Sequence, residues 1–218
     1  MFFNSHTHFL HSDCDEVAIV NCNPDDDMNT LRRQSLTSPQ RFLFSVGLHP
    51  WDVAADWKEK VAMVKEKILE KDVVAIGECG LDKLRGDFEL QKQAFSSQLA
   101  LARELGMPVV VHCVKAFDEM LALVCDSDRI MLHGFRGKWQ QAKQLAAKGI
   151  MLSFGSQYNI DALRFVFTAN LPFFLETDDR RLSVCQIYEQ AAHHLGVDVS
   201  HLARLCETHR EAFFRRHA

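Results

Sequence analysis

The chain has 218 residues, a net charge of −4 and an apolar fraction of 47%, which suits one large domain or two small ones with a substantial core. The negative charge excludes a basic surface of the kind that wraps duplex nucleic acid. No apolar run reaches the ~18 residues that span a bilayer, and no basic segment precedes the N-terminal apolar run, so we expect no signal peptide.

Short β-type runs alternate with longer helical patterns along the chain. The expected strands are Phe2–Asn4 continuing to His6, Val17–Asn21, Phe42–Val46, Val73–Gly77, Pro108–His112, Ile130–His133, Ile150–Phe154 and Phe173–Glu176. The expected helices are Met28–Leu36, Trp57–Glu70, Phe88–Leu105, Ala116–Val124, Trp139–Ala147, Ile160–Ala169, Cys185–His194 and Ser200–Arg215.

Eight strands, each followed by a helix, predict an α/β protein with a single (β/α)8 TIM-type barrel domain over residues 1–218. Because such barrels typically have ~250 residues, we expect a compact version with short loops. The alternative is an open doubly wound sheet, but no Gly-rich phosphate fingerprint follows the first strand.

Seven cysteines are scattered along the chain and form no Cys-x-x-Cys pair. An odd number without a regular framework favours reduced thiols. We therefore expect a cytoplasmic protein with no membrane association and no obligate protein partner.

The ends of the predicted strands carry metal-binding residue types. His6 and His8 are two residues apart in the first strand, so both side chains project to one face. Later strands end in His49, Glu78, His112, His133 and Asp178. In a (β/α)8 barrel the active site lies at the C-terminal ends of the strands, so these side chains are expected to converge there.

This set of residues suits a pair of divalent ions, which lie ~3.5–4 Å apart when a carboxylate bridges them. We assign His6, His8 and Asp178 to one ion. We assign His112 and His133 to the other, and Glu78 to both. Asp178 is also the expected general base toward a metal-bound water. Histidine with carboxylate accommodates Zn, Mn, Ni or Co, and Mg more weakly.

Six segments together resemble a known family. They are Ser5–His8, Val46–Pro50, Ala75–Asp82, Gln91–His112, His133–Gly137 and Leu175–Asp178. Their sequence and order are similar to those of the TatD-like metal-dependent hydrolases of the amidohydrolase superfamily. The resemblance implies a TIM-type barrel, two divalent metals and phosphodiester hydrolysis, usually as a DNase with 3′→5′ exonuclease character. DNA ends or small phosphodiesters are then the expected substrates, and the family's metal positions fall on the same six residues.

Several neighbouring positions depart from the family pattern. Val114 and Lys115 stand where the family often has Arg and Asp, and Arg180 replaces a common Pro. The candidate phosphate contacts are therefore Lys115, Arg136 and Arg180. The two arginines suit this role because a guanidinium offers a bidentate fork to phosphate. His49 is a candidate substrate contact or a residue that positions the ligands.

Three further residues near the predicted mouth have structural interpretations. Trp51 is expected to pack, with base stacking as the alternative. Asp82 is expected to hold its loop, with holding a histidine ring as the alternative. Glu176 has two equal interpretations, orienting a ligand histidine or making a buried structural hydrogen bond.

The sequence leaves two other functions open. The same metal site could hydrolyse an amide, ester or lactone, as elsewhere in the superfamily, and the changed arginine positions motivate this alternative. A non-enzymatic barrel with a vestigial site is the third hypothesis, and the presence of all six ligands argues against it.

Overall fold

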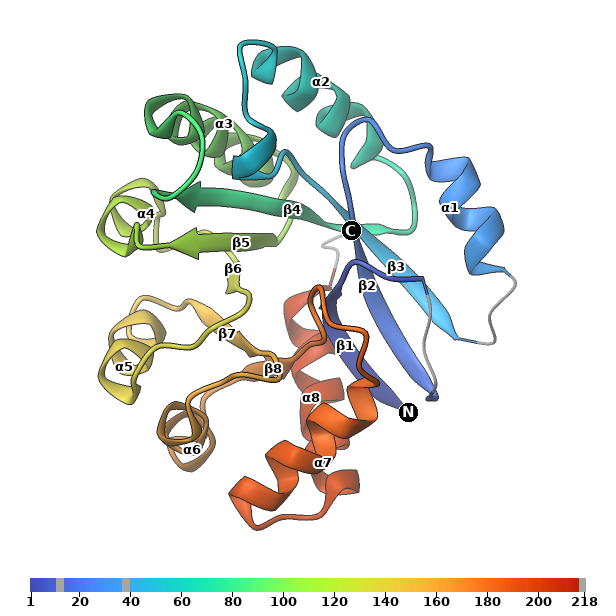
Figure 1. Ribbon diagram of the computed structural model, residues 1–218, viewed down its shortest axis with the longest axis vertical. Helices are drawn as coiled ribbons and strands as arrows, with labels where there is room; N and C mark the ends of the chain where they lie inside the picture. Colours follow the sequence, from blue (N-terminus) through green and yellow to red (C-terminus); the bar gives the residue numbers. More distant parts are fainter. Residues whose placement is uncertain (11–13, 37–39, 216–218) are drawn as a thin grey trace. The chain divides into compact units, whose positions relative to one another are not determined.

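The computed structural model describes residues 1–10, 14–36 and 40–215 (Figure 1). Its strands are β1 (Phe2–Thr7), β2 (Glu16–Cys22), β3 (Arg41–Val46), β4 (Val73–Asp82), β5 (Val109–Val114), β6 (Ile130–Leu132), β7 (Met151–Phe154) and β8 (Phe173–Leu175). Its α-helices are α1 (Met28–Ser35), α2 (Trp57–Lys67), α3 (Phe88–Leu105), α4 (Phe117–Leu123), α5 (Trp139–Ala146), α6 (Ile160–Thr168), α7 (Val184–Leu195) and α8 (Val199–Phe213). A short 3-10 helix, η1 (Pro50–Asp52), precedes α2.

The strands of the described residues form one sheet in the order β1 to β8. The pairs β1–β2, β3–β4, β4–β5 and β7–β8 are all parallel. A parallel bridge between Thr7 and Asp178 links the end of β1 to the segment after β8. This topology confirms the predicted (β/α)8 fold class.

The helices occur in the order of the expected ranges, and this order departs from a simple rule of one helix after every strand. The described residues between β1 and β2 include no helix, whereas both α7 and α8 follow β8. Only residues 8–15 separate β1 from β2, fewer than the dozen or so that a helical crossover needs. Among the helices of the described residues, none is both long and apolar enough to cross a membrane.

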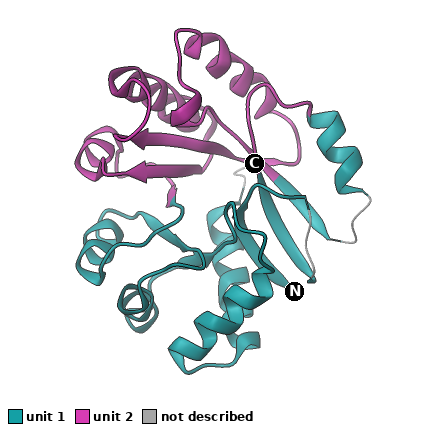
Figure 2. Ribbon diagram, in the orientation of Figure 1, with its two compact units in different colours: residues 1–20, 28–43, 132–215 teal, residues 21–27, 44–131, 216–218 magenta. Residues whose placement is uncertain are grey.

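The chain falls into two compact units, each assembled from distant segments (Figure 2). Unit 1 contains residues 1–20, 28–43 and 132–215, and unit 2 contains residues 21–27, 44–131 and 216–218, the last three of which lie outside the described residues. The single domain expected over residues 1–218 stays a prediction.

In unit 2, helix α3 packs on β4 through an apolar face that also carries two buried glutamines. The Asp87 carboxylate accepts the N–H groups of Glu89 and Leu90 at the start of the helix, as an N-cap should. Gly106 ends the helix with φ +61°, a left-handed conformation that glycine adopts without a Cβ penalty. The expected bounds of this helix are confirmed.

In unit 1, β1 is held by aromatic side chains from the end of the chain. The Phe3 ring meets Phe174 of β8 and Phe214 at centroid distances of 5.1 and 5.8 Å. The Tyr188 hydroxyl of α7 donates to the Phe3 carbonyl at 2.9 Å. Buried aromatic pairs of this kind add stabilisation beyond the area they bury. They fix β1, which contains His6 and ends one residue before His8.

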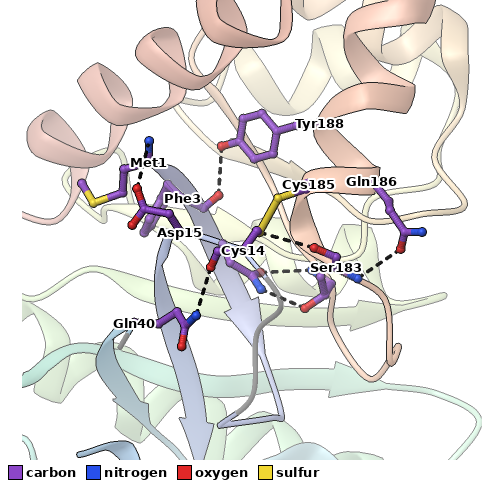
Figure 3. Close-up of a disulfide and its surroundings, with 11 residues drawn as sticks. Met1, Phe3, Cys14, Asp15, Gln40, Ser183, Cys185, Gln186 and Tyr188 are labelled. Carbon is purple, nitrogen blue, oxygen red and sulfur yellow. Dashed lines mark hydrogen bonds and ion pairs between the residues drawn. A yellow bond between two sulfur atoms is a disulfide. The ribbon is translucent and has the colours of Figure 1, made fainter. Parts of the chain in front are cut away.

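The expectation of reduced thiols is wrong at two positions. Cys14, just before β2, and Cys185, in the first turn of α7, form a disulfide (Figure 3). Cys79, Cys113, Cys125 and Cys206 are free thiols. The pairing joins residues 171 positions apart, and no spacing pattern in a sequence specifies such a pair.

Candidate metal centre

The segments that end β1 and follow β8 are joined through their main chains. The Asp178 N–H donates to the His6 carbonyl at 3.1 Å, and the His8 N–H donates to the Asp178 carbonyl at 3.2 Å. Because strand residues two apart face the same side, this pairing brings the three side chains together. The His6 side chain is fully buried, whereas those of His8 and Asp178 are partly accessible.

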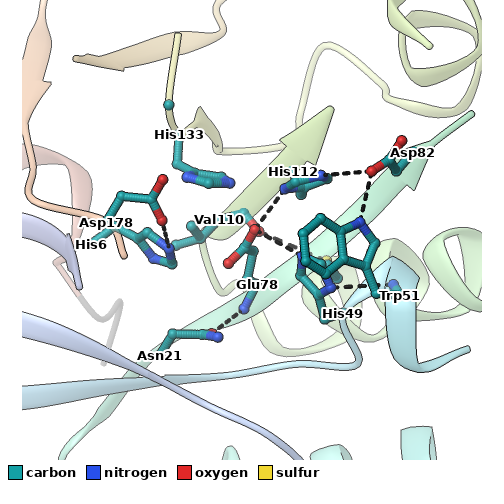
Figure 4. A network of polar contacts seen from close by, with 12 residues as sticks. His6, Asn21, His49, Trp51, Glu78, Asp82, Val110, His112, His133 and Asp178 are labelled. Atoms are coloured by element: carbon teal, nitrogen blue, oxygen red, sulfur yellow. Dashed lines mark hydrogen bonds and ion pairs between the residues drawn. The ribbon is translucent and has the colours of Figure 1, made fainter. Parts of the chain in front are cut away.

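The donor atoms of these three residues lie within reach of one cation. Asp178 Oδ1 is 3.7 Å from His6 Nε2 and 3.6 Å from His8 Nε2, and Figure 4 shows the contact with His6. One donor atom from each residue lies within 4.8 Å of the other two. The structure therefore groups the residues expected to hold one ion, and their imidazole and carboxylate donors suit a divalent transition metal.

His133, which follows β6, belongs to the same group. Its ring centroid is 4.5 Å from that of His6, and its Nδ1 is 3.5 Å from Glu176 Oε1. Within the described part of the chain, Glu176 Oε2 is buried without a hydrogen-bond partner, which is costly unless a proton or a cation compensates. We call His6, His8, His133, Glu176 and Asp178 the unit 1 cluster.

Short polar contacts hold this cluster in place. Two hydrogen bonds join Asn4 and Thr177. The Asn4 amide donates to Thr177 Oγ1 at 2.9 Å, and the Thr177 N–H donates to Asn4 Oδ1 at 3.1 Å. Glu176 Oε1 accepts the Gly134 N–H at 2.6 Å. Glu176 thus makes a buried structural bond and also faces His133, so both interpretations drawn from the sequence describe its position.

The second group lies in unit 2 around Glu78, at the C-terminal half of β4. Glu78 Oε1 is 2.8 Å from His112 Nδ1 and 3.2 Å from His49 Nε2 (Figure 4). The Glu78 carboxylate is buried, and its main-chain N–H donates to Asn21 Oδ1 at 2.6 Å. We call His49, Glu78 and His112 the unit 2 cluster; a donor atom from each lies within 4.8 Å of the others.

The role of His49 follows from its other ring nitrogen. His49 Nδ1 accepts the Trp51 N–H at 3.2 Å and caps the helix η1. A neutral imidazole that accepts at Nδ1 carries its proton at Nε2. The Nε2 atom of His49 therefore faces Glu78 Oε1 at 3.2 Å, a position that fits one of the two roles considered from the sequence, that of positioning a ligand.

Asp82, at the end of β4, connects His112 with Trp51. Asp82 Oδ2 is 3.6 Å from His112 Nε2 and accepts the Trp51 indole N–H at 2.7 Å. Burial alone would raise the pKa of the Asp82 carboxyl, but hydrogen bonds from Trp51 and Leu84 and the nearby His112 lower its pKa below the usual value. Asp82 thus contacts the His112 ring and the Trp51 indole as well as the main chain of its own loop.

Trp51 differs from its expected packing role. Its side chain is 54% exposed, although its indole N–H is anchored. The sequence offers no signal for this anchor, because Asp82 lies 31 residues further along the chain.

Backbone approach at Gly80 sets the spacing of β4 and β5 beside the unit 2 cluster. Gly80 pairs with His112 and has φ +144°. A Cβ at this position would lie 2.0 Å from the His112 carbonyl oxygen, which no side chain tolerates. Only glycine therefore lets the strand that carries Glu78 approach the strand that carries His112 in this way.

The candidate phosphate contacts fall in different units. Arg136 and Arg180 both line a pocket of unit 1 that also contains Asp178. The distance from Arg180 Nε to Oδ1 of the exposed Asp179 carboxylate is 3.4 Å. Lys115 is exposed after β5 in unit 2, and its role as a phosphate contact stays a prediction.

Comparison with known proteins identifies related sequences. The family described as TatD related DNase matches residues 5–215. A protein of Cronobacter sakazakii named 3′-5′ ssDNA/RNA exonuclease TatD is 40% identical over 115 residues, which cover 50% of this chain and 43% of that protein. A protein of the same name from Erwinia billingiae is 30% identical over 201 residues, covering 78% and 77% of the two chains. The chain thus matches less than half the length of the first relative and about three quarters of the second.

A solved structure agrees with the fold. The Escherichia coli K12 protein YjjV, described as a TatD homolog, aligns with a TM-score of 0.78 at 21% identity. The alignment covers 98% of this chain and 97% of YjjV. At that identity the likeness concerns the fold.

Proposed function

The chain belongs to the family of TatD-related DNases, and from this premise we propose that it is a divalent-metal-dependent hydrolase of phosphodiester bonds. Its proposed substrates are the free ends of single-stranded DNA or RNA, degraded in the 3′→5′ direction, as the names of its relatives suggest. The observation that supports the proposal most is the grouping of histidine and carboxylate donors in each unit.

The donor set fits two divalent ions. The residues that would hold them are the six expected from the sequence: His6, His8, Glu78, His112, His133 and Asp178. Imidazole combined with carboxylate suits Zn, Mn, Co or Ni, and Mg more weakly. Such ions, when bound, acidify water and stabilise negative charge on phosphate oxygens.

The carboxylates of Asp178 and Glu78 are the proposed catalytic groups that the protein itself supplies. Asp178 is partly accessible to solvent, so its carboxylate can take the proton of an attacking water as general base. Glu78 is the proposed ligand of both ions. His49 Nε2 lies 3.2 Å from Glu78 Oε1, and its Nδ1 accepts the Trp51 N–H, so His49 is placed to orient the Glu78 carboxylate.

Cationic side chains are the proposed contacts for the substrate backbone. Arg136 and Arg180 line the pocket that contains Asp178, so a phosphate bound by their guanidinium groups would lie beside the proposed general base. Lys115 is the third proposed contact. Arginine is well suited to this role because its fork binds two phosphate oxygens at once.

Metal reconstitution on defined substrates tests the proposed function. Protein stripped with a chelator is given Mg, Mn, Co, Ni or Zn in turn and assayed on single-stranded oligonucleotides labelled at the 5′ end. We expect metal-dependent removal of nucleotides from the 3′ end. His6→Ala should abolish this activity and lower the amount of bound metal, whereas His193→Ala, which removes an exposed histidine of α7, should change neither.

The possible results separate the alternatives. Metal binding with no cleavage of any oligonucleotide or of bis-p-nitrophenyl phosphate would contradict phosphodiester hydrolysis, and amide, ester and lactone substrates would be assayed next. Failure to bind metal at all would contradict the metal centre itself.

A further inference from the structure

The exposed ring of Trp51 is fixed in orientation. Single exposed aromatic residues are common on protein surfaces, but this one is anchored through its indole N–H, which donates to Asp82 Oδ2 at 2.7 Å. Asp82 is itself buried. The Asp82 N–H donates to the buried Gln91 side chain at 2.8 Å, and Asp82 Oδ1 accepts the Leu84 N–H at 2.8 Å. A ring held in this way loses little conformational freedom when a ligand stacks on it.

The anchored ring lies beside the unit 2 cluster. Its centroid is 5.1 Å from the ring of His49 and 6.0 Å from that of His112. Figure 4 shows Trp51 next to both histidines, with its indole nitrogen directed toward Asp82. A nucleotide that placed its phosphate near Glu78 would therefore have an exposed aromatic surface close to its base.

A cation lies over the same ring. The guanidinium carbon of Arg85 is 4.9 Å from the Trp51 ring centroid. Arg85 is exposed, and among the described residues no carboxylate forms an ion pair with its guanidinium. The pair thus offers a π surface and a phosphate-binding fork at one place, the combination that single-stranded nucleic-acid sites use.

We propose that Trp51 and Arg85 form a nucleotide-binding element of the active site, in which the indole stacks on a base of the single strand and the guanidinium contacts a neighbouring phosphate. This inference rests on the proposed function and names the feature that selects nucleic acid over simple phosphodiesters. Stacking depends on the π surface of a base, so the element favours single-stranded ends over paired ones without strong sequence preference.

Substrates with and without a base provide the test. Initial rates are measured on single-stranded oligonucleotides whose 3′-terminal nucleotides are normal or abasic, with wild type, Trp51→Ala and Trp51→Phe. Wild type should prefer the normal end by about tenfold or more in kcat/KM, since stacking contributes roughly 1–3 kcal/mol per base. Trp51→Ala should lose this preference, mainly through KM, and Trp51→Phe, which keeps an aromatic ring but lacks the N–H that anchors it to Asp82, should retain part of it.

Two further variants complete the design. Trp139→Ala, which removes another partly exposed tryptophan from helix α5, should keep the wild-type preference. Arg85→Gln should raise KM equally for normal and abasic ends and reduce the salt dependence of binding, because its proposed partner is a phosphate.

The outcomes separate this inference from the proposed function. If Trp51→Ala slows both substrates equally, the indole only supports Asp82 and His112, and the inference is overturned. If wild type cleaves neither substrate with any metal, the proposed function fails. The inference is then decided by binding of a fluorescent oligonucleotide, where equal affinity of wild type and Trp51→Ala overturns it.

Discussion

Asp178 is placed by its main chain as much as by its carboxylate. Its N–H and carbonyl bond the main chains of His6 and His8, and its φ of +55° is uncommon for a residue with a side chain. A non-glycine residue in this conformation persists only where its surroundings favour it. Replacement of the carboxylate alone should therefore leave the backbone of the unit 1 cluster intact.

We predict that Asp178→Asn lowers kcat by about 10²- to 10⁴-fold, the usual contribution of a general base, and lowers metal affinity in part. The variant should fold normally, because the main-chain bonds remain. Steady-state kinetics with saturating metal and a thermal melt measure the two effects. Asp126→Asn, at an exposed loop carboxylate, is the matched control, and a kcat for Asp178→Asn within threefold of wild type would remove it as the base.

At this scale the sequence identified the residues that carry charge or imidazole, and it raised positioning roles for His49 and Glu176, but it missed the anchor of Trp51. The alternation of a strand predicts that His6 and His8 share a face, and the structure groups them with Asp178. The contact of Asp82 with Trp51 could not be predicted, because it joins β4 and η1 through side-chain conformations that no local pattern specifies.

At the scale of elements, helix α3 supports both loops that flank the unit 2 cluster. Its glutamines Gln91 and Gln98 are seven residues apart and lie on one face, as helical periodicity requires. Gln98 accepts the Leu48 N–H at 2.8 Å and donates to the Leu48 carbonyl at 3.2 Å, next to His49. Gln91 makes the equivalent pair of bonds with the main chain of Asp82. Buried amides therefore replace missing backbone partners at both positions.

We predict that Gln98→Leu lowers the free energy of unfolding by about 2–4 kcal/mol, because the buried N–H and carbonyl of Leu48 lose their partners. It should also reduce activity, since Leu48 precedes His49. Urea denaturation and hydrolysis assays measure both effects. Gln93→Leu, on the exposed face of the same helix, should be nearly neutral, and equal stability of the two variants would contradict the supporting role of Gln98.

Helix α8 carries a histidine that should make stability depend on pH. Burial lowers the pKa of His209 below its usual 6.5, and its hydrogen bond with the Phe173 carbonyl offsets this only in part. The unfolded chain therefore binds the proton more tightly than the folded protein. The contribution of His209 to stability is present above about pH 6.5 and is lost as the pH falls through the lowered pKa.

The measurement compares urea midpoints of wild type and His209→Gln across this pH range. We expect the stability of wild type to decline more steeply than that of His209→Gln as the pH falls below about 6.5. His201→Gln, at an exposed histidine of the same helix, should follow wild type. Parallel pH profiles for wild type and His209→Gln would contradict the prediction.

The positions of strands and helices were predictable because each carries its own periodicity and its own end signals, such as Gly106 after α3. The two helices after β8 were predictable in the same way, because the sequence ranges Cys185–His194 and Ser200–Arg215 each carry a helical pattern. Only residues 8–15 connect β1 to β2, fewer than a helical crossover needs.

For the whole molecule, the chain's interleaved units each carry one cluster of metal-type donors, and neither cluster is local in sequence. The unit 1 cluster draws on residues 6 to 178, and the unit 2 cluster on residues 49 to 112. Folding must therefore precede metal binding at full affinity, because in an unfolded chain only His6 and His8 stay near each other. Bound metal should in turn stabilise the folded protein by mass action.

The Cys14–Cys185 disulfide makes a second long-range connection, between the segment that follows His8 and the helix that follows Asp178. It encloses most of the chain. In the chain-entropy view, a cross-link over so large a loop stabilises the folded state by roughly 2–5 kcal/mol, mainly by restricting the unfolded chain. The bond therefore acts on global stability, and through the segments it joins it also limits local opening around the unit 1 cluster.

We predict that treatment with a thiol reductant lowers the melting temperature by about 5–15 °C, since 1 kcal/mol corresponds to roughly 2–4 °C for a chain of this size. Cys14→Ser and Cys185→Ser should melt at the temperature of the reduced wild type and should not respond to reductant, because each already lacks the cross-link. Cys125→Ser, at an exposed free cysteine, should melt like oxidised wild type. Equal melting temperatures for oxidised and reduced wild type, with free-thiol titration confirming that the bond had been broken, would show that the cross-link adds nothing to stability.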